Sequence, residues 1–170
     1  LRDRAHHVIE SFEKLNFERI EFHKWLQWLL FEQLTEVKKE LTRQNILLLG
    51  DLPFLVSRES ADVWSNPGYF LLHLSSGAPP DMYFAMGQKW GMPPYDWNSI
   101  ANDGFIYLKE KLKYAENFYD MYRIDHFVGL FRVWVSTADE NTTPGTFMPK
   151  EDYLWEPHGR RIIEEMVNAA

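Results

Sequence analysis

Three residues of catalytic type lie together in the segment YRIDHF at 122–127, at the end of an apolar stretch. Side chains alternate between the two faces of an extended strand, so Arg123 and Asp125 are expected to point one way and His126 the other. A guanidinium beside a carboxyl group favours the ionised acid. An ionised carboxylate can act as a nucleophile or stabilise a developing positive charge, which makes Asp125 the leading candidate for a catalytic residue.

Each acidic candidate also has a purely structural interpretation. Arg123 and Asp125 could equally form a structural ion pair, because ion pairs without any catalytic role also shift the pKa values of their members. A second acid, Asp51, lies in the apolar run ILLLGDLPFLV at 46–56, which indicates a buried strand with a polar residue at its exit. Asp51 could belong to a site at that exit, or it could cap a turn before Pro53.

Helical and extended patterns alternate along the rest of the chain. Apolar residues at a helical period predict a long amphipathic helix over about 17–43, and Asn45 suits a left-handed residue at its end. A second helix is expected over about 104–117, capped by Asn102 or Asp103. Its apolar face holds Phe105, Leu108, Leu112 and Ala115.

The helix at 104–117 leads into the strand that carries Asp125, and further elements follow that strand. A short strand is expected at 130–135, and a last helix begins near Pro157. Strand, crossover helix and strand in succession indicate a parallel unit, which builds either a doubly wound sheet or a (β/α)₈ barrel. In both architectures the sites lie at the carboxyl ends of strands, where Asp51 and Asp125 are expected.

Residues 57–101 are expected to form one long loop on the same face as these two acids. The loop holds five of the nine prolines and many aromatic residues, among them Tyr69, Phe70, Tyr83, Phe84, Trp90, Tyr95 and Trp97. Proline restricts the unfolded chain, and exposed aromatic rings can pack on the apolar face of a sugar ring, so the loop suits a rigid cleft wall. The alternative, that these rings form a satellite core, is the more common outcome for such residues.

Composition narrows the class of protein. The 170 residues are 45% hydrophobic and 16% aromatic, which indicates a folded domain, and the net charge of −7 without a basic block argues against nucleic acid as a partner. The absence of cysteine suits a reducing, cytoplasmic setting. We see no membrane helix or signal peptide. Because residue 1 is Leu and not Met, we expect a piece of a larger protein.

Motifs for bound cofactors are not found in the sequence. The six histidines are scattered without HExxH or similar ligand spacing, so no metal site is expected. The GxGxxG and GxxxxGK[ST] phosphate motifs are also absent, so no nucleotide cofactor is expected.

Three long motifs, in order, closely resemble the 4-alpha-glucanotransferases, also called amylomaltases or disproportionating enzymes. The motifs are GDLPFLV with SADVW (50–56 and 60–64), PPDMYFAMGQKWGMPPYDW (79–97) and YRIDHFVGLFRVW (122–134). The resemblance implies a (β/α)₈ barrel related to that of the alpha-amylases, and transfer of alpha-1,4-glucan segments between maltodextrins with retention of anomeric configuration. Maltooligosaccharides and alpha-glucan chains would be the partners, with no metal or organic cofactor.

The resemblance also implies a role for individual residues. Asp125 would be the nucleophile, Arg123 would hold its carboxylate ionised, and His126 would bind the sugar at the cleavage point. Asp51 and Trp90 would line the donor site. Less direct matches in the loop add further sugar-binding residues, namely Asp81, Tyr83, Gln88 and Tyr95.

The chain departs from the family pattern in the loop and in length. Met82 is inserted where many members read PPDYF, and Met92, Pro94 and Val128 replace common Asn, Leu and Arg, which changes the expected loop geometry but not the nucleophile. Retaining transfer needs two carboxylates about 5–5.5 Å apart, and the family's acid/base Glu lies on the next barrel strand, beyond residue 170. A barrel typically needs about 250 residues. We therefore expect residues 1–170 to be a central fragment of one catalytic barrel domain, an incomplete barrel without an internal domain boundary.

Two alternatives stay open at this point. The parent protein could be an amylase-like alpha-glucan hydrolase with the same nucleophile, or this piece could be a non-catalytic sugar-binding fragment. A slice of a barrel leaves strand edges and apolar faces uncovered, so self-association is expected, or flexibility around residues 136–155, which have no periodic pattern.

Overall fold

The computed structural model describes residues 3–139 and 145–169, which divide into two compact units. The first unit comprises residues 1–50 and 117–121, and the second comprises residues 51–116 and 122–170. No helix of the described residues is long and apolar enough to cross a membrane. The assignment of residues 1–170 to one catalytic barrel domain stays a prediction.

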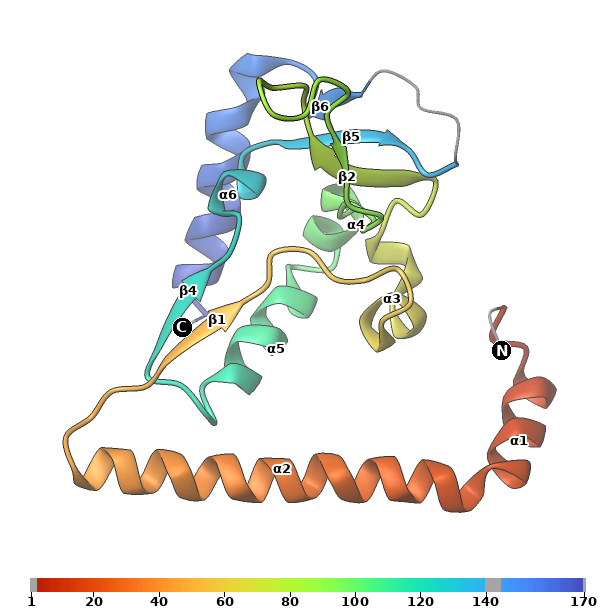
Figure 1. Cartoon of the computed structure of the whole chain (residues 1–170), viewed down its shortest axis with the longest axis vertical. Coiled ribbons are helices and arrows are strands. Elements are labelled where there is room, and N and C mark those ends of the chain that lie inside the picture. The colour runs from red at the N-terminus through yellow and green to blue at the C-terminus, as the bar shows by residue number, and fades with distance from the viewer. Residues whose placement is uncertain (1–2, 140–144, 170) are drawn as a thin grey trace. The chain divides into compact units, whose positions relative to one another are not determined.

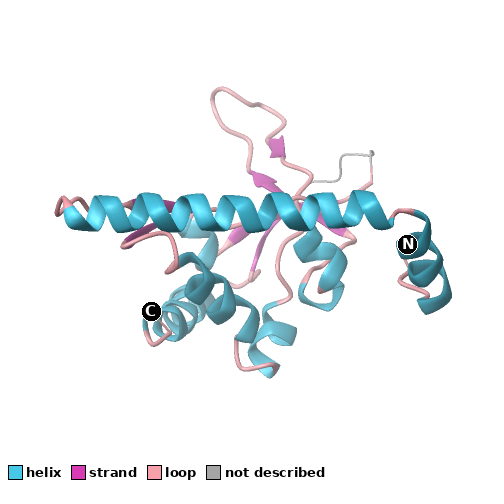
Figure 2. Cartoon of the chain, turned by 90° about the horizontal axis from the view of Figure 1, so that it is seen from below, coloured by secondary structure: helices cyan, strands magenta, loops and turns pink. Residues whose placement is uncertain are grey.

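The first unit is dominated by a long helix. Helix α1 (His6–Leu15) precedes α2 (Phe17–Arg43), and Figure 2 shows α2 as one uninterrupted helix. The structure confirms the predicted bounds of 17–43, and Asn45 has the predicted left-handed conformation, with φ of 57°. Within the same unit Lys38 Nζ donates to the carbonyl of Tyr119 at 2.9 Å, which ties the helix to the chain segment before β4.

Strands β1 (Leu49–Leu52) and β4 (Met121–Ile124) pair in a two-stranded sheet (Figure 1). The amide of Asp120 donates to the carbonyl of Leu48, and the amide of Asp125 donates to the carbonyl of Leu52. Residue numbers therefore increase in the same direction along both strands, which means that the strands run parallel. Helix α5 (Ile106–Ala115) lies between them in sequence, as the predicted crossover requires.

The prediction of a buried strand within residues 46–56 is correct for the presence of a strand and wrong for most of its burial. Gly50 is buried, but Leu49 is 56% exposed and Asp51 is exposed. The strand is also only four residues long. Its one strand neighbour in the described chain is β4, so much of its surface stays open.

The second unit contains an antiparallel sheet with the order β3-β2-β5-β6, drawn in the upper part of Figure 1. Its strands are β2 (Leu74–Ala78), β3 (Gln88–Lys89), β5 (Val133–Thr137) and β6 (Thr146–Met148). The strand expected at 130–135 thus begins later, because residues 127–130 form a 3₁₀ turn. Residues 136–155 include β6 and a 3₁₀ turn at Asp152–Leu154, while their portion 140–144 lies outside the described residues.

Residues 57–101 are not the irregular loop that the sequence predicts. They form α3 (Ala61–Ser65), a 3₁₀ turn (Pro67–Tyr69), β2, β3 and α4 (Trp97–Asn102). The sequence of β2, LSSGA, has no alternating apolar pattern. Two of its buried residues, Ser75 and Ser76, are polar, so the pattern of apolar residues does not predict a strand here. Gly77 is essential to the pairing, since a Cβ there would lie 1.9 Å from the carbonyl oxygen of Gln88.

The helix caps also differ from the prediction. Asp96 caps α4, where its Oδ1 accepts from the amides of Asn98 and Ser99 at 3.1 and 3.2 Å. Asn102 ends that helix and does not cap the next one, and α5 instead follows Phe105, whose φ is 61°. Helix α6 (Trp155–Val167) begins two residues before the expected Pro157.

One hydrophobic core holds the second unit together. Phe105 and Leu108 of the predicted apolar face belong to this core, and Leu112 and Ala115 are buried as well. The best-buried side chains come from different elements, as Ile100 of α4 and Ile162 of α6 show. Phe54, which follows β1, belongs to this core and is 6% exposed. The core therefore fixes the segment just after β1, where the candidate site begins.

Candidate active site

Arg123 joins the two predicted acids in one cluster. Its Nε donates to Asp51 Oδ1 at 3.0 Å and its Nη2 to Asp51 Oδ2 at 2.7 Å. The same Nη2 donates to Asp125 Oδ1 at 3.0 Å. Asp51 lies in β1, Arg123 in β4, and Asp125 directly after β4, so the parallel pairing brings together residues that are 72 positions apart in sequence.

The hydrogen bonds in this cluster are unequally shared. Asp51 accepts two bonds from Arg123 in the bidentate arrangement that a guanidinium favours, whereas Asp125 accepts one. Hydrogen bonding to Asp51 and the charge of Asp51, with a smaller contribution from Asp125, raise the pKa of Arg123 above its ordinary value. Arg123 stays charged, and Asp125 Oδ2 is left free of any bond to it, so this oxygen can face a ligand.

His126 adopts a left-handed conformation, with φ of 49°, that few residues other than glycine take. Its ring contacts Trp90 edge-on at 5.1 Å between centroids and Phe54 at 5.9 Å. Burial lowers the pKa of His126, and the charge of Asp125 opposes that effect. Its imidazole is therefore mostly neutral at pH 7 and can both donate and accept a hydrogen bond.

A hollow of about 420 Å³ opens beside Asp125 and His126. Trp90 lines it as well, and the remaining wall consists of Pro53, Phe54, Leu55 and Met92. An apolar and aromatic wall with a few polar groups is the usual make-up of a small-molecule site. The arrangement can hold an apolar ring face against Trp90 while a carboxylate oxygen approaches from Asp125.

Three other predicted site residues lie on the β2–β3 hairpin. Trp90 Nε1 donates to Gln88 Oε1 at 3.0 Å, so Gln88 fixes the orientation of the indole. Asp81 Oδ1 accepts from the amides of Tyr83 and Phe84 at 2.8 and 2.7 Å, which shapes the tip of the hairpin. Tyr83 is 82% exposed there. Direct contact of these residues with a sugar stays a prediction.

Tyr95 occupies a different position from the other predicted sugar-binding residues. It is 2% exposed, and its hydroxyl donates to the carbonyl of Phe54 at 2.6 Å. Burial raises the pKa of its hydroxyl, which keeps the donor protonated. The aromatic residues of 57–101 therefore divide: Phe70 and Tyr95 lie in the core, whereas Tyr83 and Phe84 are exposed. The buried pair agrees with the alternative that these rings form a core, and not with the expectation that they line a rigid cleft wall.

Sequence reasoning missed Phe54 and Gly129. Phe54 forms part of the hollow, and a Cβ on Gly129 would lie 2.4 Å from the Phe54 ring and 2.7 Å from His126 Cδ2. The glycine allows Phe54 and His126 to pack in the turn after β4. Gly129 comes two residues after the YRIDHF segment, but the reason for a glycine there is its contact with Phe54, which the sequence alone does not reveal.

Replacing Tyr95 by Phe should lower the free energy of unfolding by about 1–3 kcal/mol, because the buried carbonyl of Phe54 would lose its donor. Denaturant titration of the purified protein measures this change. Tyr83→Phe is the matched control, since its ring is exposed and the same loss of a hydroxyl should change stability by less than about 0.5 kcal/mol. Equal effects of the two substitutions would contradict the assigned role of the Tyr95 hydroxyl.

Comparison with known proteins places the chain in a family. A family model described as 4-alpha-glucanotransferase matches residues 1–155. A 4-alpha-glucanotransferase of Chlamydia trachomatis is 40% identical over 162 residues, which cover 95% of this chain and 30% of that protein. The chain belongs to the 4-alpha-glucanotransferase family, as the three motifs predict.

Two solved structures support the same assignment. An amylomaltase from Streptococcus agalactiae in complex with acarbose superposes with a TM-score of 0.78 at 26% identity, over 94% of this chain and 34% of that one. The amylomaltase from Corynebacterium glutamicum gives a TM-score of 0.68 at 30% identity, over 88% of this chain and 21% of that one. The chain thus has the mixed α/β fold of part of an amylomaltase and spans about a third or less of the length of the relatives it matches.

Within residues 3–139 and 145–169 no group of three or more His, Asp or Glu side chains is arranged to hold a metal ion. The cluster of Asp51, Arg123 and Asp125 is instead held by its own charge pairing.

Proposed function

We propose that this chain is a central part of the catalytic (β/α)₈ barrel of a 4-alpha-glucanotransferase that works by retaining double displacement. The observation that carries the proposal is the cluster of Asp51, Arg123 and Asp125 at the carboxyl ends of two parallel strands, beside the hollow that Trp90 and His126 line. Carboxyl ends of parallel strands are where barrel enzymes place their catalytic groups. The relatives' shared name supplies the reaction class.

In the first step an Asp125 carboxylate oxygen attacks the anomeric carbon of the donor glucan. The bond from that carbon to the glycosidic oxygen breaks, and the oxygen takes a proton from an acid/base Glu that we place outside this chain. The product is a covalent glucosyl ester of Asp125. Arg123 Nη2 holds Oδ1 of the nucleophile, and the Oδ2 of Asp125 is the oxygen best placed to attack.

In the second step a hydroxyl of an acceptor sugar attacks the same anomeric carbon. The acid/base Glu, now ionised, removes the proton of that hydroxyl, and the bond from the carbon to the Asp125 oxygen breaks. Two inversions give net retention. Asp51 and Trp90 line the donor site, and His126 bonds the sugar at the cleavage point with its neutral imidazole.

The partners in this proposal are maltooligosaccharides and longer alpha-glucan chains, such as those of starch or glycogen metabolism. The complexed amylomaltase from Streptococcus agalactiae, which binds acarbose, supports this choice of ligand class. We also propose a cytoplasmic enzyme that needs no organic cofactor. Asp81, Tyr83 and Gln88 on the β2–β3 hairpin would lie beside the acceptor sugar. Tyr95 would support the hollow indirectly, through its hydrogen bond to the carbonyl of Phe54.

Transfer and hydrolysis differ in a measurable quantity, the number of reducing ends. Incubating the longer enzyme with maltotriose should give glucose together with maltopentaose and other redistributed chains, while the total concentration of reducing ends stays constant. Each hydrolytic event would instead add one reducing end. Reducing-end assay with chromatography of the products therefore tests the proposal, and a steady rise in reducing ends would assign the enzyme to the amylase-like hydrolases. Binding of maltotriose without any product would assign it a non-catalytic role.

A further inference from the structure

The chain segment that leaves β1 holds Asp125 by its backbone. The amide of Asp125 donates to the carbonyl of Leu52, the last residue of β1, at 3.0 Å. The next carbonyl along the chain, that of Pro53, accepts from Lys111 Nζ of α5 at 3.3 Å. Lys111 therefore bonds the peptide group that directly follows the one to which Asp125 is bonded.

Pro53 couples these two carbonyl groups. A peptide bond is planar and the proline ring fixes φ, so ψ of Pro53 is the one backbone bond free to rotate between them. Little of a shift of the Pro53 carbonyl can be absorbed by a single rotation. Most of the shift is passed to the Leu52 carbonyl and, through its hydrogen bond, to the backbone of Asp125.

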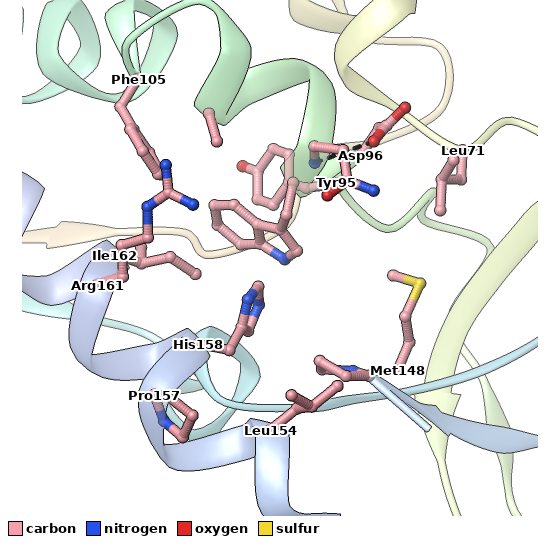
Figure 3. Close-up of a pocket in the computed structure, with 14 residues that line it drawn as sticks. Leu71, Tyr95, Asp96, Phe105, Met148, Leu154, Pro157, His158, Arg161 and Ile162 are labelled. Carbon is pink, nitrogen blue, oxygen red and sulfur yellow. Dashed lines mark hydrogen bonds between the residues drawn. The ribbon is translucent and has the colours of Figure 1, made fainter. Parts of the chain in front are cut away.

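The residue after Pro53 is anchored from another element. The carbonyl of Phe54 accepts from the hydroxyl of Tyr95, which precedes α4, at 2.6 Å. Figure 3 shows Tyr95 in the wall of a neighbouring pocket of about 520 Å³. Tyr95 and Lys111 thus hold adjacent carbonyls, and the carbonyl held by Lys111 is the nearer in sequence to the one that holds Asp125.

Packing alone leaves room for this segment to move. A cavity of about 30 Å³ is lined by residues 52–54 and by Leu108, Lys111 and Leu112 of α5. Among the described residues that line this cavity, Lys111 is the one with a charged side chain. Apolar contacts around a cavity do not fix a backbone position, whereas the hydrogen bond from Lys111 is directed at one carbonyl oxygen.

The surroundings of Lys111 favour a strong donor. The side chain is half-buried, and burial lowers its pKa, while the charge of Asp62 opposes this change. Asp62 belongs to the SADVW motif and is held in turn by the hydroxyl of Tyr107, at 2.8 Å from its Oδ1. The Asp62 carboxylate thus supports the charged form of Lys111, which makes the stronger hydrogen bond to a carbonyl.

We propose that Lys111 is a positioning residue for the transfer reaction, because its ammonium group fixes the Pro53 carbonyl and thereby the backbone position of Asp125. The inference rests on the proposed function, in which Asp125 is the nucleophile. Lys111 does not line the hollow beside Asp125. Its effect is therefore on the rate of attack by Asp125 and not on the binding of the sugar.

Kinetics of Lys111→Met in the longer enzyme test this role. Methionine keeps a flexible apolar stem but has no donor. We expect kcat on maltotriose to fall about tenfold or more, since a shift of about 1 Å at a reacting group can cost about 100-fold, while KM changes by less than about twofold. Circular dichroism at the assay temperature measures the folded fraction. Lys113→Met, at an exposed position of the same helix, is the matched control and should leave kcat unchanged.

Two polar substitutions separate the donated hydrogen bond from side-chain polarity. Lys111→Arg keeps a cation with N–H donors on a long stem, and it should recover most of the kcat lost in Lys111→Met. Lys111→Gln has a side chain one bond shorter than lysine and should lose kcat as Lys111→Met does. Equal losses in all three variants would overturn the role of the bond to Pro53.

The outcomes also separate this inference from the proposed function. A lower melting temperature in Lys111→Met with kcat within about twofold of the unchanged enzyme would overturn the inference, because Lys111 would then only stabilise the fold. A higher KM at unchanged kcat would overturn it as well. Both results leave the proposed function intact, whereas failure of the unchanged enzyme to redistribute maltotriose would count against the proposed function.

Discussion

Asp125→Asn should lower kcat of the longer enzyme on maltotriose by about 10³-fold or more, with maltotriose still bound. The amide is a poor nucleophile, but it has nearly the size and shape of the carboxylate. Its oxygen can still accept from Arg123 Nη2, the bond that holds the Asp125 side chain in the present structure. Steady-state kinetics and a separate titration of the inactive variant with maltotriose would measure kcat and binding independently.

The structural interpretation of the same residue predicts the opposite pattern. If Asp125 only neutralised Arg123, its replacement would lower the melting temperature while kcat fell by less than about tenfold, because Asp51 would still hold two of the guanidinium's bonds. Asp152→Asn, at an exposed position in a 3₁₀ turn, is the matched control and should leave both quantities nearly unchanged.

Local patterns in the sequence were sufficient to predict the elements that depend on nearby residues. The apolar period of α2 and the left-handed Asn45 at its end were predicted correctly, and so was the buried face of α5 with Leu108 and Leu112. Strand β2 was missed because its small residues, such as Ser75, are buried by the close approach of neighbouring strands and not by their own hydrophobicity.

The site shows the same division between local and long-range information. The alternation of a strand placed Arg123 beside Asp125, and the structure contains that contact. The bidentate bond from Arg123 to Asp51 depends on the register of β1 against β4 across 72 residues, which no local pattern specifies. Tyr95 shows that a residue within a functional motif can have a structural role. Its place in the motif predicts contact with a ligand, but its hydroxyl donates to the buried carbonyl of Phe54.

The 170-residue chain by itself should not redistribute maltotriose at a measurable rate. The leaving glycosidic oxygen needs a proton, and general acid catalysis typically contributes about 10²–10⁴-fold to such a step. The carboxylate that the structure brings close to Asp125 is Asp51, which would have to give up two charge-assisted bonds to Arg123 before it could carry and donate a proton. Asp51 is therefore a poor substitute for the acid/base Glu that we place elsewhere in the enzyme.

A donor that needs no protonation makes this prediction sharper. Fluoride leaves alpha-maltosyl fluoride without help from an acid, so attack by Asp125 can be observed even where the acid/base group is missing. We expect the isolated chain to release at most one fluoride per molecule, since the maltosyl ester of Asp125 would then lack a base to activate an acceptor. We also expect it to form no longer glucans from maltotriose. Asp125→Asn of the same chain corrects for spontaneous fluoride loss. Sustained redistribution of maltotriose by the isolated chain would show that these residues contain a complete catalytic pair, and Asp51 would then be the acid to replace first.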